Sequence, residues 1–201
     1  MKTSALFLSA LALCLCSCTI DRVTVPSRGA TEEMDISAAA DRAADKLAAQ
    51  LTAGGSVYID ATYFDAPDAK YALGAIRAAI ARRGTRILLD RVKADRVIEV
   101  RSGALSVDQN KFLIGIPEFA LPIPLAGEAT IPEIALYSFH DDQGVAKFAA
   151  TEFKQADGSL VTAPEPVYGY AHNEKRTALL FISWSHEDFL DEKDKDPEDR
   201  K

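Results

Sequence analysis

The sequence predicts a single α/β (α+β) domain, in which two main helices lie on one face of a mixed, largely antiparallel sheet. Two segments place apolar residues three and four positions apart, as on the buried face of a helix. Several other segments alternate apolar and polar residues, as half-buried strands do. Hydrophobic residues make up 48% of the chain, which is enough to form the core of one domain.

The first expected helix begins near Asp35 or Ser37, either of which can act as an N-cap, and runs to about Leu51. Alanines and leucines four residues apart form its apolar stripe. Gly54–Gly55 is the expected stop signal. Residues 56–64 (SVYIDATYF) alternate and are rich in β-forming residues, so they predict a strand.

The second expected helix covers residues 69–83, with Gly84 as its C-terminal stop. Residues 85–90 (TRILLD) and 95–101 (DRVIEVR) predict two further strands. The order helix, strand, helix, strand, strand indicates a sheet covered by helices on one side.

The second half of the chain reads as strands and turns. Residues 112–134 are apolar but contain four prolines, which exclude a continuous helix or central strand, so we expect extended pieces and turns. The elements expected after it are a hairpin of 134–140 and 145–153 about a turn at 141–144, a second turn at Asp157–Gly158, and a closing strand at 177–185.

The N-terminus has the pattern of an export signal. A basic Lys2 precedes an apolar run over residues 5–15, too short to be a transmembrane helix. The following Leu15-Cys16-Ser17-Cys18 resembles the bacterial lipobox. That resemblance implies signal cleavage between Ser17 and Cys18 and lipidation of the Cys18 sulfur. An ordinary signal peptide that contains cysteines, or an uncleaved anchor, is the alternative.

The expected organisation follows from this signal. It comprises a lipoprotein signal peptide (1–17), a lipidated cysteine with a polar tether (18–34), a globular α/β domain (35–186) and an acidic disordered tail (187–201). The chain's three cysteines are Cys14, Cys16 and Cys18, so the domain contains no internal disulfide. By resemblance to enterobacterial sorting, Thr19 after the cysteine favours the outer membrane, facing the periplasm.

Charge and motifs exclude several functions. The net charge is −7 and the isoelectric point is about 5.0, which argues against nucleic-acid binding. The three histidines lack the spacing of metal ligands, and the chain has neither a nucleophile elbow nor a glycine-rich phosphate loop. His140, with Asp141 and Asp142, is expected at a solvated turn. We therefore expect no catalytic residues, no metal and no cofactor.

Four charged residues are candidates for a structural polar network. They stand within or beside predicted strands: Asp60, Asp95, Arg101 and Glu133. Buried charges require such partners because desolvation is costly. Contact with a partner or ligand, and simple exposure, are the alternatives.

The proline-rich apolar stretch is the first candidate for a contact with another protein. Its candidate contact residues are Phe112, Ile114, Phe119, Ile123 and Leu125. An exposed apolar ledge of this kind would favour binding of an envelope protein. The alternatives are an ordered loop that packs on the sheet, and insertion into lipid.

Four blocks resemble an uncharacterised family of bacterial envelope lipoproteins, known only as a domain of unknown function. The blocks are ADRVIEVRSGAL from Ala94, LIGIPEFALPIP from Leu113, IPEIALYSF from Ile131 and GVAKFAA from Gly144. The order of elements is more loosely similar to curli-secretion and penicillin-binding-protein-activator lipoproteins, and to the N-terminal domain of the Tol–Pal propeller protein. These likenesses imply an αβ fold and binding to other envelope proteins.

The expected function is therefore that of a non-enzymatic lipoprotein, which is anchored to a membrane by its lipid and binds or positions another envelope protein. A small-ligand carrier is the alternative, and a hydrolase of cell wall or lipid is the third. A carrier requires an enclosed apolar pocket, and a hydrolase requires a cleft with clustered acidic residues or histidines.

Overall fold

A computed structural model of the chain describes residues 19–23, 29–123 and 127–188. The helical elements are α2 (Ala30–Gln50), α3 (Ala69–Arg82) and a 3-10 turn, η1 (Arg91–Lys93). The strands are β1 (Thr19–Val23), β2 (Ser56–Tyr63), β3 (Arg86–Ile87), β4 (Arg96–Ile116), β5 (Phe119–Ile123), β6 (Gly127–Ile131), β7 (Ile134–Lys154), β8 (Leu160–Thr162), β9 (Val167–Ala178) and β10 (Ile182–Glu187).

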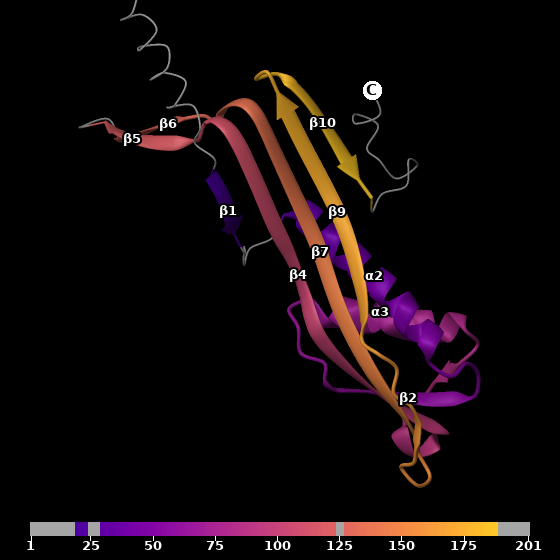
Figure 1. Cartoon of the computed structure of the whole chain (residues 1–201). Coiled ribbons are helices and arrows are strands. Elements are labelled where there is room, and N and C mark those ends of the chain that lie inside the picture. The colour runs from indigo at the N-terminus through magenta and orange to yellow at the C-terminus, as the bar shows by residue number, and fades with distance from the viewer. Residues whose placement is uncertain (1–18, 24–28, 124–126, 189–201) are drawn as a thin grey trace, which may run out of the picture. The chain divides into compact units, whose positions relative to one another are not determined.

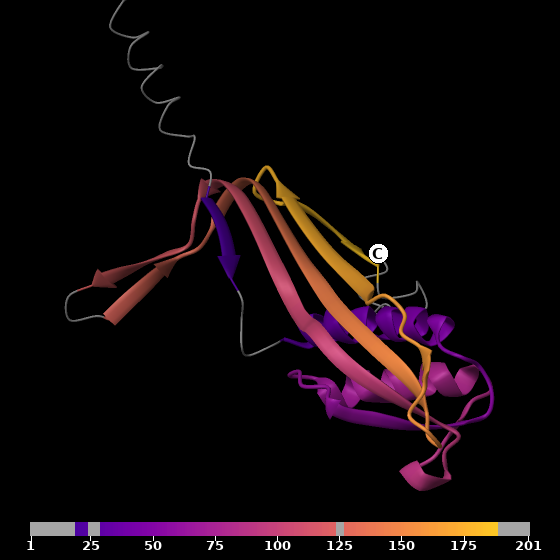
Figure 2. The same ribbon diagram turned by 60° about the horizontal axis from the view of Figure 1, so that its bottom comes forward.

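The predicted fold class is confirmed: a mixed sheet carries the two helices on one face (Figures 1 and 2). The strand order is β10-β9-β7-β4-β2-β3, with β1 paired to β4 and β8 paired to β7, while β5 and β6 form a separate two-stranded sheet. The described residues divide into two compact units. Unit 1 lies within Met1–Thr24, Gln109–Asp142 and Asn173–Glu187, and unit 2 within Val25–Asp108, Gln143–His172 and Asp188–Lys201.

In unit 2, helix α2 begins at Ala30, earlier than predicted. The Gly29 N–H donates a 3.0 Å hydrogen bond to the Glu32 carboxylate, and two acidic residues in the first turn favour a helix N-terminus. Asp35 is therefore a buried residue inside the helix and not its cap. Together with β1, this helix start lies within the range 18–34 that was predicted as a tether.

The α3 segment matches its prediction closely, and it connects parallel strands. Strand β2 pairs in parallel with β3 on one side and with β4 on the other. A strand–helix–strand crossover between parallel neighbours gives α3 its place on the sheet. Strand β3 has only two residues, far fewer than the predicted segment 85–90.

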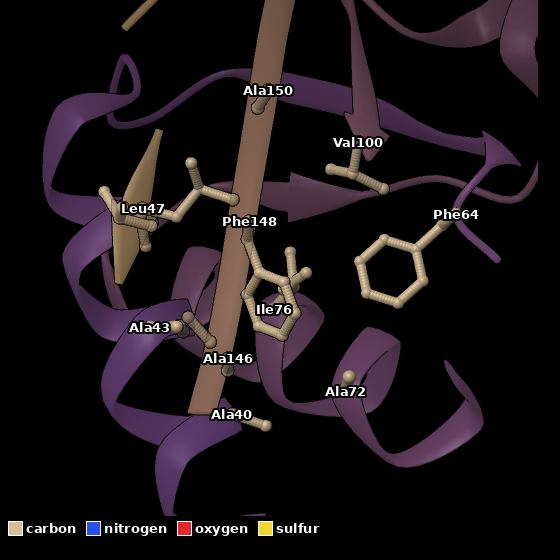
Figure 3. Close-up of a cluster of buried hydrophobic side chains, with 14 of the residues drawn as sticks. Ala40, Ala43, Leu47, Phe64, Ala72, Ile76, Val100, Ala146, Phe148 and Ala150 are labelled. Carbon is tan, nitrogen blue, oxygen red and sulfur yellow. The ribbon is translucent and has the colours of Figure 1, made fainter. Parts of the chain in front are cut away.

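The core of unit 2 lies between the two helices and the sheet (Figure 3). Phe148 of β7 is fully buried, and its ring centroid lies 5.4 Å from that of Phe64. Leu47 and Ile76 reach the same cluster from the two helices. The α2 face of this core consists largely of alanines. Their small side chains let the helix backbone approach the strands closely.

Glycines on β7 and β9 make this close approach possible. A Cβ atom added to Gly144 would overlap the Asp35 carbonyl group of α2, and one added to Gly169 would overlap the Ala39 carbonyl oxygen. The predicted turn at 141–144 is therefore wrong, since Gly144 lies inside the continuous strand β7. The turn at Asp157–Gly158 is confirmed, because Gly158 has a φ of 69° and its N–H bonds back to Lys154.

Unit 1 contains β1, the end of β4, the start of β7 and the β9–β10 hairpin, together with β5 and β6. The predicted closing strand at 177–185 is wrong, because the chain reverses within it. Ile182 pairs with Ala178, and the three intervening residues, Leu179–Phe181, form the β9–β10 loop. The described residues of the proline-rich segment form extended pieces, as predicted, and β5 and β6 pair antiparallel.

Candidate functional site

Each of the four residues that were candidates for a structural polar network has its own local partners. The Asp60 carboxylate accepts hydrogen bonds from the N–H and the hydroxyl of Thr62, at 3.1 and 2.6 Å, and pairs with Arg91 at 3.1 Å. The hydrogen bonds from Thr62 hold the pKa of Asp60 below its usual range. Asp95 accepts hydrogen bonds from the hydroxyl and N–H of Ser56, which lower its pKa in the same way.

The other two predicted network residues also have local partners. Arg101 donates a 3.1 Å hydrogen bond to the Thr151 hydroxyl and lies 3.8 Å from the Glu99 carboxylate. Glu133 pairs with Lys111 at 2.6 Å in unit 1. Asp60 and Glu133 are half-buried, and Asp95 and Arg101 are exposed.

A buried ion pair exists elsewhere in unit 2, between Arg96 of β4 and Glu152 of β7. The Glu152 side chain is fully buried, and the Arg96 side chain is 11% exposed. Arg96 also donates to the carbonyl oxygens of Thr52 and Gly54, while Glu152 accepts from the Thr52 N–H at 3.2 Å. The pair therefore holds the loop that follows α2 against the sheet. Sequence reasoning missed it because both residues occupy strands that otherwise show exposed charges.

A polar hollow of about 170 Å³ lies in unit 1. It is lined by Glu133, Ser138, His140, Lys175 and Thr177. Contrary to prediction, His140 is not at a turn but inside β7. Burial, with a smaller contribution from the positive charge of Lys111, lowers the pKa of His140 below its ordinary value of 6.5. The alternation of residues 138 and 140 along one strand was the signal that could have located this hollow.

A second hollow, of about 250 Å³, lies in unit 2 between the N-terminal parts of the two helices, beside Met34, Ile36 and Tyr71. Ligand pockets commonly measure about 300–1,000 Å³, so both hollows are small for a carrier of organic ligands. Within residues 19–23, 29–123 and 127–188, no cluster of three or more His, Cys, Asp or Glu residues could hold a metal ion. No helix in these ranges combines the length and the hydropathy needed to cross a membrane.

Exposed apolar side chains gather in unit 1. Those on its strands and loops are Ile116, Phe119, Leu121, Ile134, Leu136, Leu179, Leu180, Phe181, Ile182 and Trp184. Seven of these ten side chains lie on two hairpins, β5–β6 and β9–β10. Large apolar side chains that form an exposed patch usually contact a protein or a membrane. The β5–β6 and β9–β10 hairpins are therefore the candidate functional segments of the described chain.

The predicted contact residues belong to this region in different ways. Phe119 lies on β5 and is 42% exposed, whereas Phe112 and Ile114 on β4 are half-buried. The Phe112 ring packs against Tyr137, with 6.3 Å between ring centroids. Ile123 lies in β5, and Leu125 falls outside the described residues, as do Ser17 and Cys18.

The β9–β10 loop was not singled out by its sequence. Its Leu179 and Leu180 have φ values of 52° and 72°, a conformation that hairpin loops usually assign to Asn or Gly. Phe181 is 80% exposed. The only signal in the sequence is a long apolar run, which predicts a closing strand and not a loop.

Comparison with known proteins identifies a family without assigning an activity. The model of a family of unknown function, DUF6655, matches residues 12–168, which is more than half of the chain. No curated protein and no solved structure matches the chain.

Proposed function

The chain belongs to the family of unknown function DUF6655, and we propose that it is a lipid-anchored protein of the bacterial envelope that binds another envelope protein without catalysing a reaction. The observation that carries the binding role is the exposed apolar β5–β6 hairpin. The lipobox-like Leu15-Cys16-Ser17-Cys18 supports the anchor, and it lies within the matched range. The outer membrane, facing the periplasm, is the proposed location because Thr19 follows the cysteine.

The β5–β6 hairpin supports protein binding because it forms a sheet of its own. Its two strands are hydrogen-bonded to each other and are not part of the main sheet. A two-stranded hairpin is only marginally stable in water unless an apolar face packs against something. Phe119 and Leu121 on β5 are both more than two-fifths exposed. A partner that covers these two side chains would supply the missing packing.

Removal of the acylated thiol is expected to release the protein from the membrane. Each acyl methylene buried in the bilayer contributes about 0.8 kcal/mol, so a diacylated Cys18 holds the chain there permanently. We expect Cys18→Ala, exported by a cleavable secretory signal peptide in place of residues 1–17, to move to the soluble fraction. Cell fractionation and mass spectrometry of the N-terminal peptide measure this.

Cys16→Ala in the native chain is the matched control, since it leaves the acceptor thiol in place. It is expected to remain membrane-bound and acylated. A Cys18→Ala protein that stays in the membrane fraction after its signal is cleaved would contradict lipid anchoring.

A photo-crosslinking residue in place of Phe119 is expected to capture one envelope protein in intact cells. Burial of a leucine side chain contributes about 1.5–3 kcal/mol, so adding Leu121→Asp should reduce the yield of the adduct about tenfold or more. Mass spectrometry identifies the captured protein.

The same crosslinker at Leu89 serves as the control, because Leu89 is 87% exposed and belongs to unit 2. We expect no adduct of the same mass from that position. Equal adducts from both positions, or an adduct whose yield Leu121→Asp leaves unchanged, would show that the hairpin is not the binding site.

A further inference from the structure

We propose that the β9–β10 loop, Leu179–Phe181, docks on the surface of the bilayer that carries the lipid anchor. This inference rests on the proposed lipidation of Cys18. It assigns a second membrane contact, made by protein side chains, to a loop that the protein-binding role of the β5–β6 hairpin does not use.

The chemistry of the loop fits a lipid surface. Residues 177–184 (TALLFISW) contain no charged side chain. Leu179, Leu180, Phe181 and Ile182 are all exposed, and Trp184 two residues further on is also exposed. Aromatic rings and aliphatic side chains without charge are the residues that enter the boundary between headgroups and acyl chains.

The backbone of the loop is not the one that leucine prefers. Both Leu179 and Leu180 have positive φ values, which are unfavourable for residues with a Cβ atom. Asn or Gly would adopt this conformation more readily and would also be more soluble at an exposed tip. Strained residues of this kind cluster at functional sites.

The position of the loop agrees with that of the anchor. Thr19, the first residue of β1, pairs with Leu113 of β4. Two residues further along β4, Gly115 lies against the backbone of Ile134 and Ala135 at the start of β7. The Ala135 carbonyl in turn accepts a 3.1 Å hydrogen bond from the Leu180 N–H. Within unit 1, the start of β1 and the β9–β10 loop therefore lie at one end of the sheet (Figures 1 and 2).

The short distance between the anchor and the sheet favours the bilayer as the contact of the β9–β10 loop. Cys18 directly precedes Thr19, and consecutive Cα atoms are about 3.8 Å apart. A lipidated Cys18 therefore holds this end of unit 1 at the membrane surface. The exposed apolar loop at the same end is therefore within reach of the lipid headgroups.

Quenching of tryptophan fluorescence by brominated lipids tests the proposal. Trp184 is the only tryptophan of the chain, so Phe181→Trp in a Trp184→Phe background reports on the loop alone. The full-length lipidated variant is reconstituted in vesicles of phosphatidylethanolamine and phosphatidylglycerol, with or without bromine on the acyl chains. We expect emission to fall about twofold or more in the brominated vesicles, since interfacial side chains lie about 5–10 Å deep.

Leu89→Trp in the same background is the matched control, because Leu89 is equally exposed but belongs to unit 2. Quenching of similar strength at positions 89 and 181, or no quenching at 181, overturns the proposal. A dimer crosslinked through position 181, without quenching, would instead identify a second copy of the chain as the occupant. Mass spectrometry measures lipidation of the same sample, so a lipidated chain without quenching refutes the docking and leaves the proposed anchor standing.

Discussion

Replacing Arg96 by methionine is expected to lower the free energy of unfolding by about 3–5 kcal/mol, because the substitution leaves the fully buried Glu152 carboxylate without its ion partner. The substitution also removes the donors to the carbonyl oxygens of Thr52 and Gly54, so the loop after α2 loses its attachment to β4. Urea denaturation monitored by circular dichroism measures the change.

Two further variants test whether the loss of stability comes from the burial of the ion pair or only from the loss of a charge pair. The Arg82–Asp45 pair connects the two helices at the surface, with both side chains more than 60% exposed, so Arg82→Met should cost about 1 kcal/mol or less. The double variant Arg96→Met/Glu152→Met removes both buried charges and should recover much of the lost stability. Equal effects of Arg96→Met and Arg82→Met would show that the buried pair is no more important than a surface one.

Gly169→Ala is expected to destabilise the protein by about 3 kcal/mol or more, because the new methyl group has no room. It would overlap the Ala39 carbonyl oxygen and lie 2.7 Å from the Ala43 backbone nitrogen. Both atoms belong to the backbone of α2, so no side chain can rotate away, and the helix itself has to move off β9. The measurement is again the free energy of unfolding.

Gly74→Ala is the matched control, since it is the same chemical change inside helix α3. Nothing lies within 4 Å of the added Cβ there. Alanine is also favoured over glycine within a helix, so we expect this variant to gain about 0.5–1 kcal/mol. If both alanine variants changed stability in the same direction, the close packing of α2 on β9 would be the wrong explanation.

Prediction from sequence succeeded where neighbouring residues determine the outcome. Helix α3 and strand β2 lie within about one residue of their predicted bounds because apolar spacing and terminal glycine signals are local. The turn at Asp157–Gly158 is confirmed for the same reason. The start of α2 was wrong by several residues, since more than one polar residue could have served as its cap.

The errors concern glycine and apolar residues, whose roles depend on distant parts of the chain. Gly144 resembled a turn glycine, but its missing side chain makes room for the α2 backbone. The run 177–185 resembled a single closing strand, but it turns back at Leu179–Phe181 and exposes its apolar side chains. A local pattern does not reveal whether a glycine forms a turn or makes room for a neighbouring backbone. It also does not reveal whether an apolar run is buried in the core or exposed at the surface.

The sequence by itself therefore determined the fold class, the two helices and the apolar face of each helix. Spacing along the chain controls which residues lie on the same face of a helix. The lipid anchor at Cys18 also follows from sequence alone, and it stays a prediction. Only the tertiary structure decided which charges are buried together, which glycines lie against the backbone of α2, and which apolar residues remain at the surface. Arg96 and Glu152 stand 56 positions apart in the chain, and their contact depends on strand pairing and on the loop that follows α2. Such contacts form only when the sheet and helices pack, so no local pattern records them.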